Sequence, residues 1–313
     1  MKWKVLVTAP YLQPVIERFR PELEARGVDL VVPAVQERLE EADLLPLVAD
    51  IDGVMCGDDR FTRRVIEAAP RLKVLSKWGT GVDSLDAAAC ADRGVAIRRT
   101  PDAFSVPVAE TVLGFLLAFT RRIVDSNDLM HAGIWKKLPG RVLSECVLGV
   151  IGVGDTGKAT VRTLRALGMT VLGHDIREIP AGFVSGTGLV VTGKDELLAK
   201  SDFVSLHTDL NPTSFHLMSD AQFALMKPGA VLINASRGPV VDEAALVRAL
   251  ESGKLAGAAL DVFEEEPLPG DSPLLAMKNV LMAPHNANSS ALYWEKIHRS
   301  TIDNLLAVLE GRG

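Results

Sequence analysis

The 313-residue sequence has little cysteine, few aromatic residues and no long apolar run. Its three cysteines, Cys56, Cys90 and Cys146, are far apart, odd in number and outside any C-x-x-C pair. This argues against a disulfide framework or a metal site and favours a reducing compartment. The most apolar stretch, 112–119, falls far short of the ~20 residues that span a bilayer, and the N-terminal apolar run is too short for a signal peptide. We therefore expect a cytoplasmic protein with no metal and no membrane segment.

Positive charge is not in excess either. The chain has 34 Lys and Arg against 40 Asp and Glu, a net charge of −6. This balance gives no general attraction for nucleic acid or anionic lipid, so we expect neither as a partner. The hydrophobic fraction of 48% is ordinary for a globular protein and excludes a disordered one. At about 150 residues per domain, the length suggests two domains.

Short β-branched runs alternate with helical patterns along the chain, which predicts βαβ units around parallel sheets. The expected strands form two series, at 5–7, 30–32, 53–55, 73–75 and 95–97, and then at 147–151, 170–173, 189–191, 203–206, 230–233, 257–260 and 280–282. A helix is expected between the series, at about 106–130, and another at about 290–309. Because no strand series follows this last helix, we expect it to pack back on the first domain.

One glycine-rich segment indicates a dinucleotide site. Gly152, Gly154 and Gly157 form G-x-G-x-x-G directly after an apolar strand and directly before a helix. The first glycine permits a tight turn, the second lets a pyrophosphate approach the backbone, and the third allows close helix–strand contact. The next strand ends in Asp175, close to the ~20-residue spacing of a ribose-binding acid. A carboxylate repels a 2′-phosphate, so we predict NAD rather than NADP, although Arg177 nearby could soften that preference.

Three ordered motifs then resemble the D-isomer-specific 2-hydroxyacid dehydrogenases, in particular those like 3-phosphoglycerate dehydrogenase. They are V-L-I-N-A-S-R-G-P-V-V-D-E at 231–243, A-L-D-V-F-E-E-E-P at 259–267 and M-A-P-H at 282–285, with G-T-G-V-D at 79–83 and V-A-E at 108–110 in support. The resemblance implies two doubly wound α/β domains. A Rossmann NAD-binding domain, 101–288, would be inserted in a flavodoxin-like substrate-binding domain made of 1–100 and 289–313.

The resemblance also implies that Arg237, Glu266 and His285 are catalytic. Arginine offers a planar fork for the carboxylate of a 2-keto acid. Histidine titrates near neutrality, so it can deliver a proton during reduction and take it back during oxidation. A carboxylate bonded to that imidazole fixes the ring and favours its protonated form. Alone, Glu266 would be interpreted as part of a solvated acidic loop, and the other histidines (His131, His174, His207, His216 and His298) as structural or exposed.

Further cofactor contacts follow from the same resemblance, besides the glycines, Asp175, Arg237 and His285. They are Thr80, Asp155, Thr156, Thr208, Ala235, Ser236, Asp261 and Asn288. The sequence departs from the family pattern around Asn286 to Asn288, and the polar run there is N-A-N-S-S at 286–290. It could contact substrate or cap the last helix, for which Asn and Ser are well suited, and the sequence does not separate these alternatives.

The substrate is less well specified. By resemblance, the loop with Lys77, Trp78 and Gly79 should present amides to the substrate carboxylate, and Arg237 should bind it as well. Lys77 and Arg99 could favour a 2-hydroxy or 2-keto acid with a second anionic group, phosphorylated or not, or could be ordinary solvated loop charges.

Alternative functions are a glyoxylate or hydroxypyruvate reductase and a catalytically weak NAD sensor. A formate-type enzyme is disfavoured because glutamine replaces the glutamate there, whereas this chain has Glu266. Family members usually dimerise through the NAD-binding domain, so we expect a homodimer. Trp135 either reaches the partner's site or is a surface tryptophan.

Overall fold

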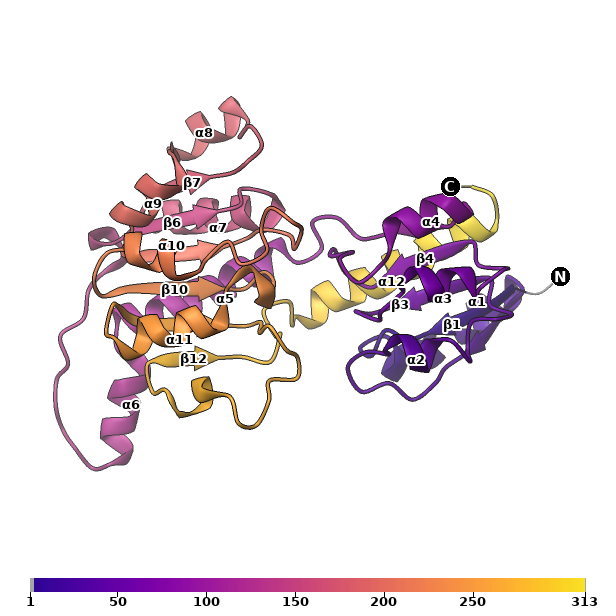
Figure 1. The fold of residues 1–313 in the computed structure, drawn as a ribbon, viewed down its shortest axis with the longest axis horizontal. Coiled ribbons are helices and arrows are strands. Elements are labelled where there is room, and N and C mark those ends of the chain that lie inside the picture. Colours follow the sequence, from indigo (N-terminus) through magenta and orange to yellow (C-terminus); the bar gives the residue numbers. More distant parts are fainter. Residues whose placement is uncertain (1–2, 313) are drawn as a thin grey trace. The chain divides into compact units, whose positions relative to one another are not determined.

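The computed structural model describes residues 3–312. The chain forms two compact units, Met1–Ala103 with Ser290–Gly313, and Phe104–Ser289 (Figure 1). The domain bounds expected from the sequence, 1–100 with 289–313 and 101–288, differ from these by one to three residues. Each unit is built on its own parallel sheet with helices on both faces.

The first unit has a five-stranded sheet in the order β2-β1-β3-β4-β5, with every pairing parallel. This is the flavodoxin-like order, in which the chain reverses direction next to β1. The strands are β1 Trp3–Val7, β2 Val28–Val31, β3 Gly53–Cys56, β4 Val74–Lys77 and β5 Ala96–Arg98. The helices are η1 Gln13–Arg18, α1 Arg20–Ala25, α2 Glu41–Leu44, α3 Arg63–Glu67, α4 Ala87–Arg93 and, at the end of the chain, α12 Ala291–Leu309.

The last helix lies against the central strands of this first sheet. Helix α12 contacts β3, β4 and β5, and the Ser76 hydroxyl on β4 donates to the Thr301 carbonyl oxygen at 2.7 Å. Gly53 on β3 allows this close approach, since a Cβ there would lie 2.9 Å from the Leu305 methyl group. The C-terminal helix is thus part of the first unit's core.

The second unit has a seven-stranded, fully parallel sheet in the order β12-β11-β10-β9-β6-β7-β8. The order of strands β6 to β11 within it, β8-β7-β6-β9-β10-β11, is the Rossmann strand order. The strands are β6 Val147–Ile151, β7 Thr170–His174, β8 Val190–Val191, β9 Phe203–Leu206, β10 Ala230–Asn234, β11 Leu255–Leu260 and β12 Val280–Met282. The helices are α5 Ser105–Thr120, α6 Ile123–His131, α7 Asp155–Ala166, α8 Ala181–Thr187, α9 Lys194–Lys200, α10 Asp220–Leu225 and α11 Glu243–Glu251, with short 3-10 turns η2 Leu143–Glu145, η3 Gly238–Val240 and η4 Pro273–Ala276.

Alternate residues of these strands enter two separate cores, one on each face of the second sheet. On β10, Leu232 packs in the core covered by α9, α10 and α11, whereas Ile233 packs in the core beneath α5 and α7. Successive strand side chains point to opposite faces, so a sheet covered on both sides needs apolar residues at every position. This explains the unbroken apolar runs in the sequence, and the predicted fold class is confirmed.

The helix predicted at 106–130 is wrong as one element, because it is two helices, α5 and α6. Thr120 ends α5, and its carbonyl oxygen accepts the backbone N–H of Arg141 at 2.8 Å instead of continuing the helix. Arg122 then takes a left-handed conformation, φ 53°, which redirects the chain before α6. The partner that breaks the helix lies in a later loop, so no local pattern predicted it.

The three cysteines are buried and unbridged, and burial raises the pKa of the Cys56 thiol to about 12. Within residues 3–312, no helix is both long and apolar enough to cross a membrane. In the same range, no group of three His, Cys, Asp or Glu side chains is arranged to hold a metal ion.

Candidate active site

The glycine turn between β6 and α7 is shaped by close backbone contacts. Gly152 has φ 89°, and a Cβ there would lie 2.7 Å from the His207 carbonyl carbon. A Cβ at Gly157 would lie 2.0 Å from the Gly152 carbonyl oxygen. These two glycines are therefore required by the fold itself. Gly154 differs, because a Cβ there would meet nothing within 4 Å, so open space lies over the N-cap residue of α7.

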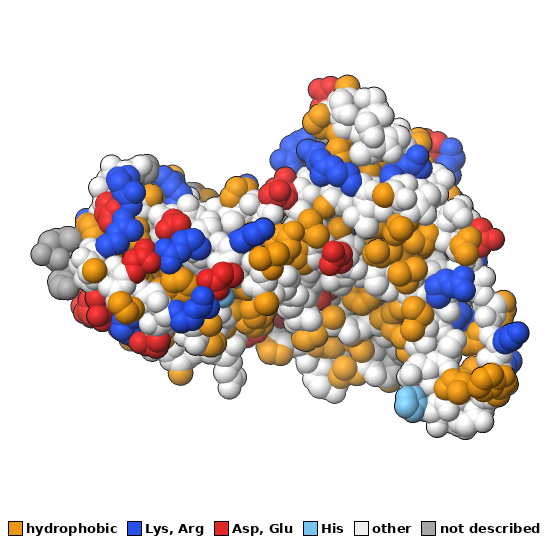
Figure 2. Space-filling model, turned by 180° about the vertical axis from the view of Figure 1, so that it is seen from behind, with side chains coloured by type: hydrophobic (Ala, Val, Ile, Leu, Met, Phe, Trp, Pro, Cys, Tyr) orange, Lys and Arg blue, Asp and Glu red, His pale blue; other side chains and the backbone are white. Residues whose placement is uncertain are grey.

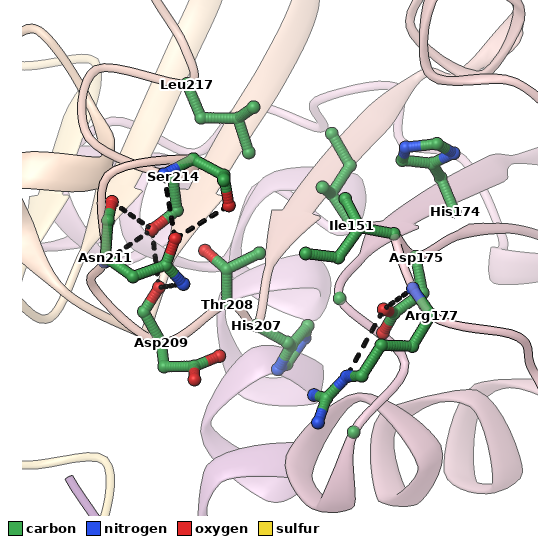
Figure 3. Close-up of a pocket in the computed structure, with 14 residues that line it drawn as sticks. Ile151, His174, Asp175, Arg177, His207, Thr208, Asp209, Asn211, Ser214 and Leu217 are labelled. Atoms are coloured by element: carbon green, nitrogen blue, oxygen red, sulfur yellow. Dashed lines mark hydrogen bonds and ion pairs between the residues drawn. The ribbon is translucent and has the colours of Figure 1, made fainter. Parts of the chain in front are cut away.

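A cavity of about 270 Å³ lies at this turn (Figure 3). It is bounded by the segments that follow β6, β7 and β9, at the carboxyl edge of the sheet where α/β proteins bind ligands. The lining residues include Gly152, Gly154, His174, Asp175, Arg177, His207, Thr208, Asp209, Asn211 and Ser214. In Figure 3, Asp175 and Arg177 lie on one side of the cavity, and Asp209, Asn211 and Ser214 on the other.

Asp175 is held at the end of β7 by two backbone amides. Its Oδ2 accepts the Val153 N–H at 2.7 Å, and its Oδ1 accepts the Arg177 N–H at 2.8 Å. A carboxylate oxygen accepts more than one hydrogen bond, so both oxygens keep capacity for a ribose diol. The Arg177 side chain is 75% exposed, with its Nε 3.9 Å from Asp175 Oδ1, so a weak, solvated contact joins the two.

The cavity fits a dinucleotide on two independent observations. The space above Gly154 faces the N-terminus of the twelve-residue helix α7, where unpaired amides and the helix dipole favour an anion. In addition, the Thr208 hydroxyl is buried and has no hydrogen-bond partner among the described residues. A buried, unsatisfied hydroxyl is unfavourable, and a bound ligand oxygen would satisfy it.

The carboxyl ends of β10, β11 and β12 carry the other predicted residues. These three strands are adjacent in the sheet, so Arg237, Glu266 and His285 all follow the same edge. The imidazole Nδ1 of His285 lies 3.0 Å from Glu266 Oε2, and Glu266 Oε1 accepts the Phe263 N–H at 3.0 Å. Both carboxylate oxygens are thus engaged, which fixes the carboxylate against the ring.

Asp261 builds the turn on which His285 sits. Its carboxylate accepts the backbone N–H groups of Asn286 at 2.7 Å and Ala287 at 2.9 Å, and its carbonyl accepts that of His285 at 2.7 Å. Burial raises the pKa of the Asp261 carboxyl, while these amide hydrogen bonds act in the opposite direction. His285 itself has φ 50°, an uncommon conformation for a residue with a side chain, and Asp261 holds it there.

Arg237 is placed by a backbone contact between the β10 and β11 loops. The Asn234 side chain at the end of β10 donates to the Arg237 carbonyl oxygen at 2.9 Å. The next residue, Gly238, packs so closely that a Cβ would lie 1.7 Å from the Phe263 carbonyl oxygen. Phe263 belongs to the turn that ends in Glu266, so the backbone positions of Arg237 and Glu266 are fixed relative to each other.

Comparison with known proteins identifies the family. The family model described as "D-isomer specific 2-hydroxyacid dehydrogenase, NAD binding domain" matches residues 113–287. A glyoxylate reductase of Thermofilum pendens is 38% identical over 86% of this chain and 81% of the relative. The chain belongs to the D-isomer-specific 2-hydroxyacid dehydrogenase family. It is an NAD-dependent oxidoreductase, and the second unit is its NAD-binding domain.

Other members of the family differ in what their names say they act on. A D-3-phosphoglycerate dehydrogenase of Methanocaldococcus jannaschii is 38% identical over 92% of this chain, but the match spans only 54% of that protein. A D-lactate dehydrogenase of Aquifex aeolicus, solved with NAD and lactic acid, superposes with a TM-score of 0.90 at 27% identity, covering 99% of this chain and 96% of that one. The substrate of this dehydrogenase is therefore not fixed by its relatives.

The remaining predicted contacts are divided between the two units. Lys77, Trp78, Gly79, Thr80 and Arg99 belong to the first unit, where the Thr80 hydroxyl donates to the Thr100 carbonyl oxygen at 3.1 Å. The predicted cofactor contacts of the second unit all come after the carboxyl ends of its strands, the edge where the cavity and the His285 turn also lie. They are Asp155, Thr156, Thr208, Ala235, Ser236, Asp261 and Asn288.

The polar run 286–290 ends in the N-cap residue of α12. The N-cap of that helix is Ser290, which makes no side-chain cap hydrogen bond. The Asn286 side chain instead accepts the Ser289 hydroxyl within its own turn.

His207 was not among the predicted site residues, yet it lines the cavity beside Thr208. The only signal for it in the sequence is its place at the carboxyl end of β9.

Proposed function

We propose that this enzyme interconverts D-2-hydroxy acids and 2-keto acids, with His285 as proton donor and acceptor. The observation that carries the proposal is the 3.0 Å contact between His285 Nδ1 and Glu266 Oε2, at the sheet edge that also holds Arg237. When bound, the reduced cofactor, NADH, would supply the hydride for reduction of the keto acid, and the oxidised form, NAD⁺, would accept it in oxidation of the hydroxy acid. The protein must then bind the acid, polarise its carbonyl and move one proton.

Glu266 decides which ring nitrogen exchanges the proton. Because Nδ1 faces the glutamate, we assign proton transfer to Nε2 of His285. A neighbouring carboxylate stabilises the imidazolium that precedes donation to the carbonyl oxygen. In oxidation the same nitrogen takes the hydroxyl proton, and the glutamate keeps the ring oriented throughout.

Arg237 is assigned to the substrate carboxylate and the adjoining carbonyl oxygen. A guanidinium stays charged at all working pH values and offers a fork of parallel donors. Its Nη1 donates to the Ser236 carbonyl oxygen at 3.0 Å, which orients the side chain. The charge also stabilises the oxygen as negative charge develops during reduction.

Steady-state kinetics with NADH and a panel of 2-keto acids test these roles. His285→Ala should lower kcat about 10²- to 10⁴-fold, and Glu266→Gln should lower it less while shifting the pH profile of kcat. NADH affinity should stay within about two-fold in Glu266→Gln, which is not among the predicted cofactor contacts. Glu265→Gln, at the exposed neighbour of Glu266, is the matched control. Wild-type kcat in His285→Ala would reject the assignment, and no turnover of any keto acid by the wild type would favour an NAD sensor.

We further propose that the substrate carries no phosphate. The Lys77 side chain is 3% exposed, and its Nζ lies 2.6 Å from both Asp58 Oδ1 and the Gly57 carbonyl oxygen. Its charge is therefore balanced by Asp58. Arg99 is exposed and donates to the Thr80 carbonyl oxygen at 3.2 Å. The neutralised charge of Lys77 supports a small keto acid of the glyoxylate or hydroxypyruvate type over a phosphorylated one.

A comparison of specificity constants separates the two substrate classes. We expect kcat/KM for glyoxylate or hydroxypyruvate to exceed that for phosphohydroxypyruvate by at least ten-fold, and Arg99→Ala to change this ratio by less than three-fold. A preference for the phosphorylated acid that Arg99→Ala abolishes would refute the proposal without touching the assignment of His285.

A homodimer through the NAD-binding domain is proposed from the exposed apolar surface around α6. No residue of α6, Ile123–His131, is buried, and the loop after it exposes 87% of Trp135. Hydrophobic side chains are visible over this part of the molecule (Figure 2), and such patches mark association sites. Analytical ultracentrifugation should show a dimer for the wild type and a larger dimer dissociation constant for Trp135→Ser. A wild-type protein that sediments as a monomer at working concentration would exclude the proposed homodimer.

A further inference from the structure

A buried chain of three side chains lies beneath the glycine turn. The Ser205 hydroxyl on β9 lies 2.9 Å from His207 Nε2, and His207 Nδ1 lies 3.3 Å from the Thr156 hydroxyl on α7. Ser205 is fully buried and His207 is 8% exposed. The imidazole therefore connects the interior of the sheet to the second residue of the helix that opens the cofactor site.

The Ser205 hydroxyl determines the direction of these hydrogen bonds. Within residues 3–312, His207 is the only hydrogen-bond partner of its oxygen. If Nε2 donated, the serine proton would remain buried and unpaired, which is unfavourable by about 1–3 kcal/mol. The serine therefore donates to Nε2. A neutral imidazole then has its proton on Nδ1, and this N–H donates to the Thr156 oxygen.

The direction of these hydrogen bonds determines the role of the Thr156 hydroxyl group. Since its oxygen accepts from His207, its own proton is available to another acceptor. The hydroxyl stands in the first turn of α7, beside Gly154, where the fold leaves open space. A threonine whose proton is directed in this way acts as a donor, adding to the backbone amides of the same turn.

We propose that Ser205 and His207 are positioning residues that set Thr156 as a hydrogen-bond donor to a pyrophosphate oxygen of the bound dinucleotide. Two further observations support this role. Burial lowers the pKa of His207 to about 4, so the ring stays neutral at working pH and keeps a single donor. Its backbone N–H also donates to the Ile151 carbonyl oxygen at 2.8 Å, which fixes the residue next to the glycine turn.

Ligand binding tests the proposal without turnover. Isothermal titration with ADP-ribose should show about ten-fold weaker binding for Thr156→Val, in line with loss of a hydrogen bond to a charged group, and near wild-type binding for Thr156→Ser. Adenosine, which lacks the pyrophosphate, should bind both variants like the wild type by NMR titration. Thr160→Val is the matched control on α7, because its hydroxyl donates to the Thr156 carbonyl oxygen and has no proton to offer a ligand.

Nitrogen NMR of the ring and a double variant complete the test. In the wild type, ¹⁵N shifts should show the proton of His207 on Nδ1, and Ser205→Ala should move a fraction of it to Nε2. In the Ser205→Ala background, Thr156→Val should weaken ADP-ribose binding by less than it does alone. A proton on Nε2 in the wild type, unchanged ADP-ribose binding in Thr156→Val, or an equal loss for adenosine would each overturn the proposal.

Discussion

The buried imidazole of His207 should make the stability of the second unit depend on pH. In the folded chain, burial lowers its pKa from 6.5 to about 4, whereas in the unfolded chain it titrates at its ordinary value. Between these two values, the unfolded state binds more protons than the folded one. The free energy of unfolding should therefore fall as pH falls from about 6.5 towards 4, and this loss should level off below 4.

The size of the effect follows from the two pKa values. At pH 7 the contribution is negligible, because the ring is mostly neutral in both states. At pH 5 the unfolded ring is almost fully protonated and the folded ring almost fully neutral, which destabilises the fold by about 2 kcal/mol. At pH 4 the loss reaches about 3 kcal/mol.

The assay compares the wild type with His207→Asn, whose amide nitrogen takes approximately the place of Nδ1. Urea unfolding followed by far-ultraviolet circular dichroism at pH 7 and pH 5 gives two stabilities for each protein. Other titrating groups, including the Asp261 carboxyl, are common to both proteins and cancel in the difference. We expect the wild type to lose about 2 kcal/mol more than the variant over this interval. Equal losses in the two proteins would refute the view of His207 as a buried neutral ring.

Two further substitutions separate fold from cofactor binding. Gly157→Ala should destabilise the second unit severely, because its Cβ would lie 2.0 Å from the Gly152 carbonyl oxygen. Gly154→Ala has open space around its Cβ, so it should keep the wild-type melting temperature. The increase in melting temperature on adding NADH should be lost in Gly154→Ala. A normal response of Gly154→Ala to NADH would show that the cofactor does not approach that residue. Asp175→Ser should raise kcat/KM for NADPH relative to NADH by ten-fold or more, since it removes the repulsion of a 2′-phosphate, and an unchanged ratio would place cofactor discrimination elsewhere.

Local features of the second unit could be predicted from the sequence because their determinants are neighbours in the chain. The strand, the glycine turn and the following helix occupy 147–166, and the structure has all three there. The helix break at Arg122 could not be predicted, because the amide that ends α5 comes from Arg141. Likewise, Lys77 resembles a free loop cation until the fold places it against Asp58.

The contact between His285 and Glu266 is intermediate between the local features and the long-range contacts just described. Nineteen residues separate the two in the chain, and only the family resemblance singled out this glutamate in an acidic trio. No pattern in the sequence shows that the Asp261 carboxylate binds the amides after His285. That contact arises because β11 and β12 are adjacent and parallel, which is a property of the tertiary fold.

The close packing of Gly238 against Phe263 has a consequence for how this enzyme can change. Main-chain atoms set the separation between Arg237 and the His285–Glu266 pair, so side-chain substitutions nearby leave that separation intact. Directed evolution towards a new keto acid should therefore accumulate its useful mutations outside this junction. A library that randomises position 238 should yield almost no active clones, whatever substrate is used for selection.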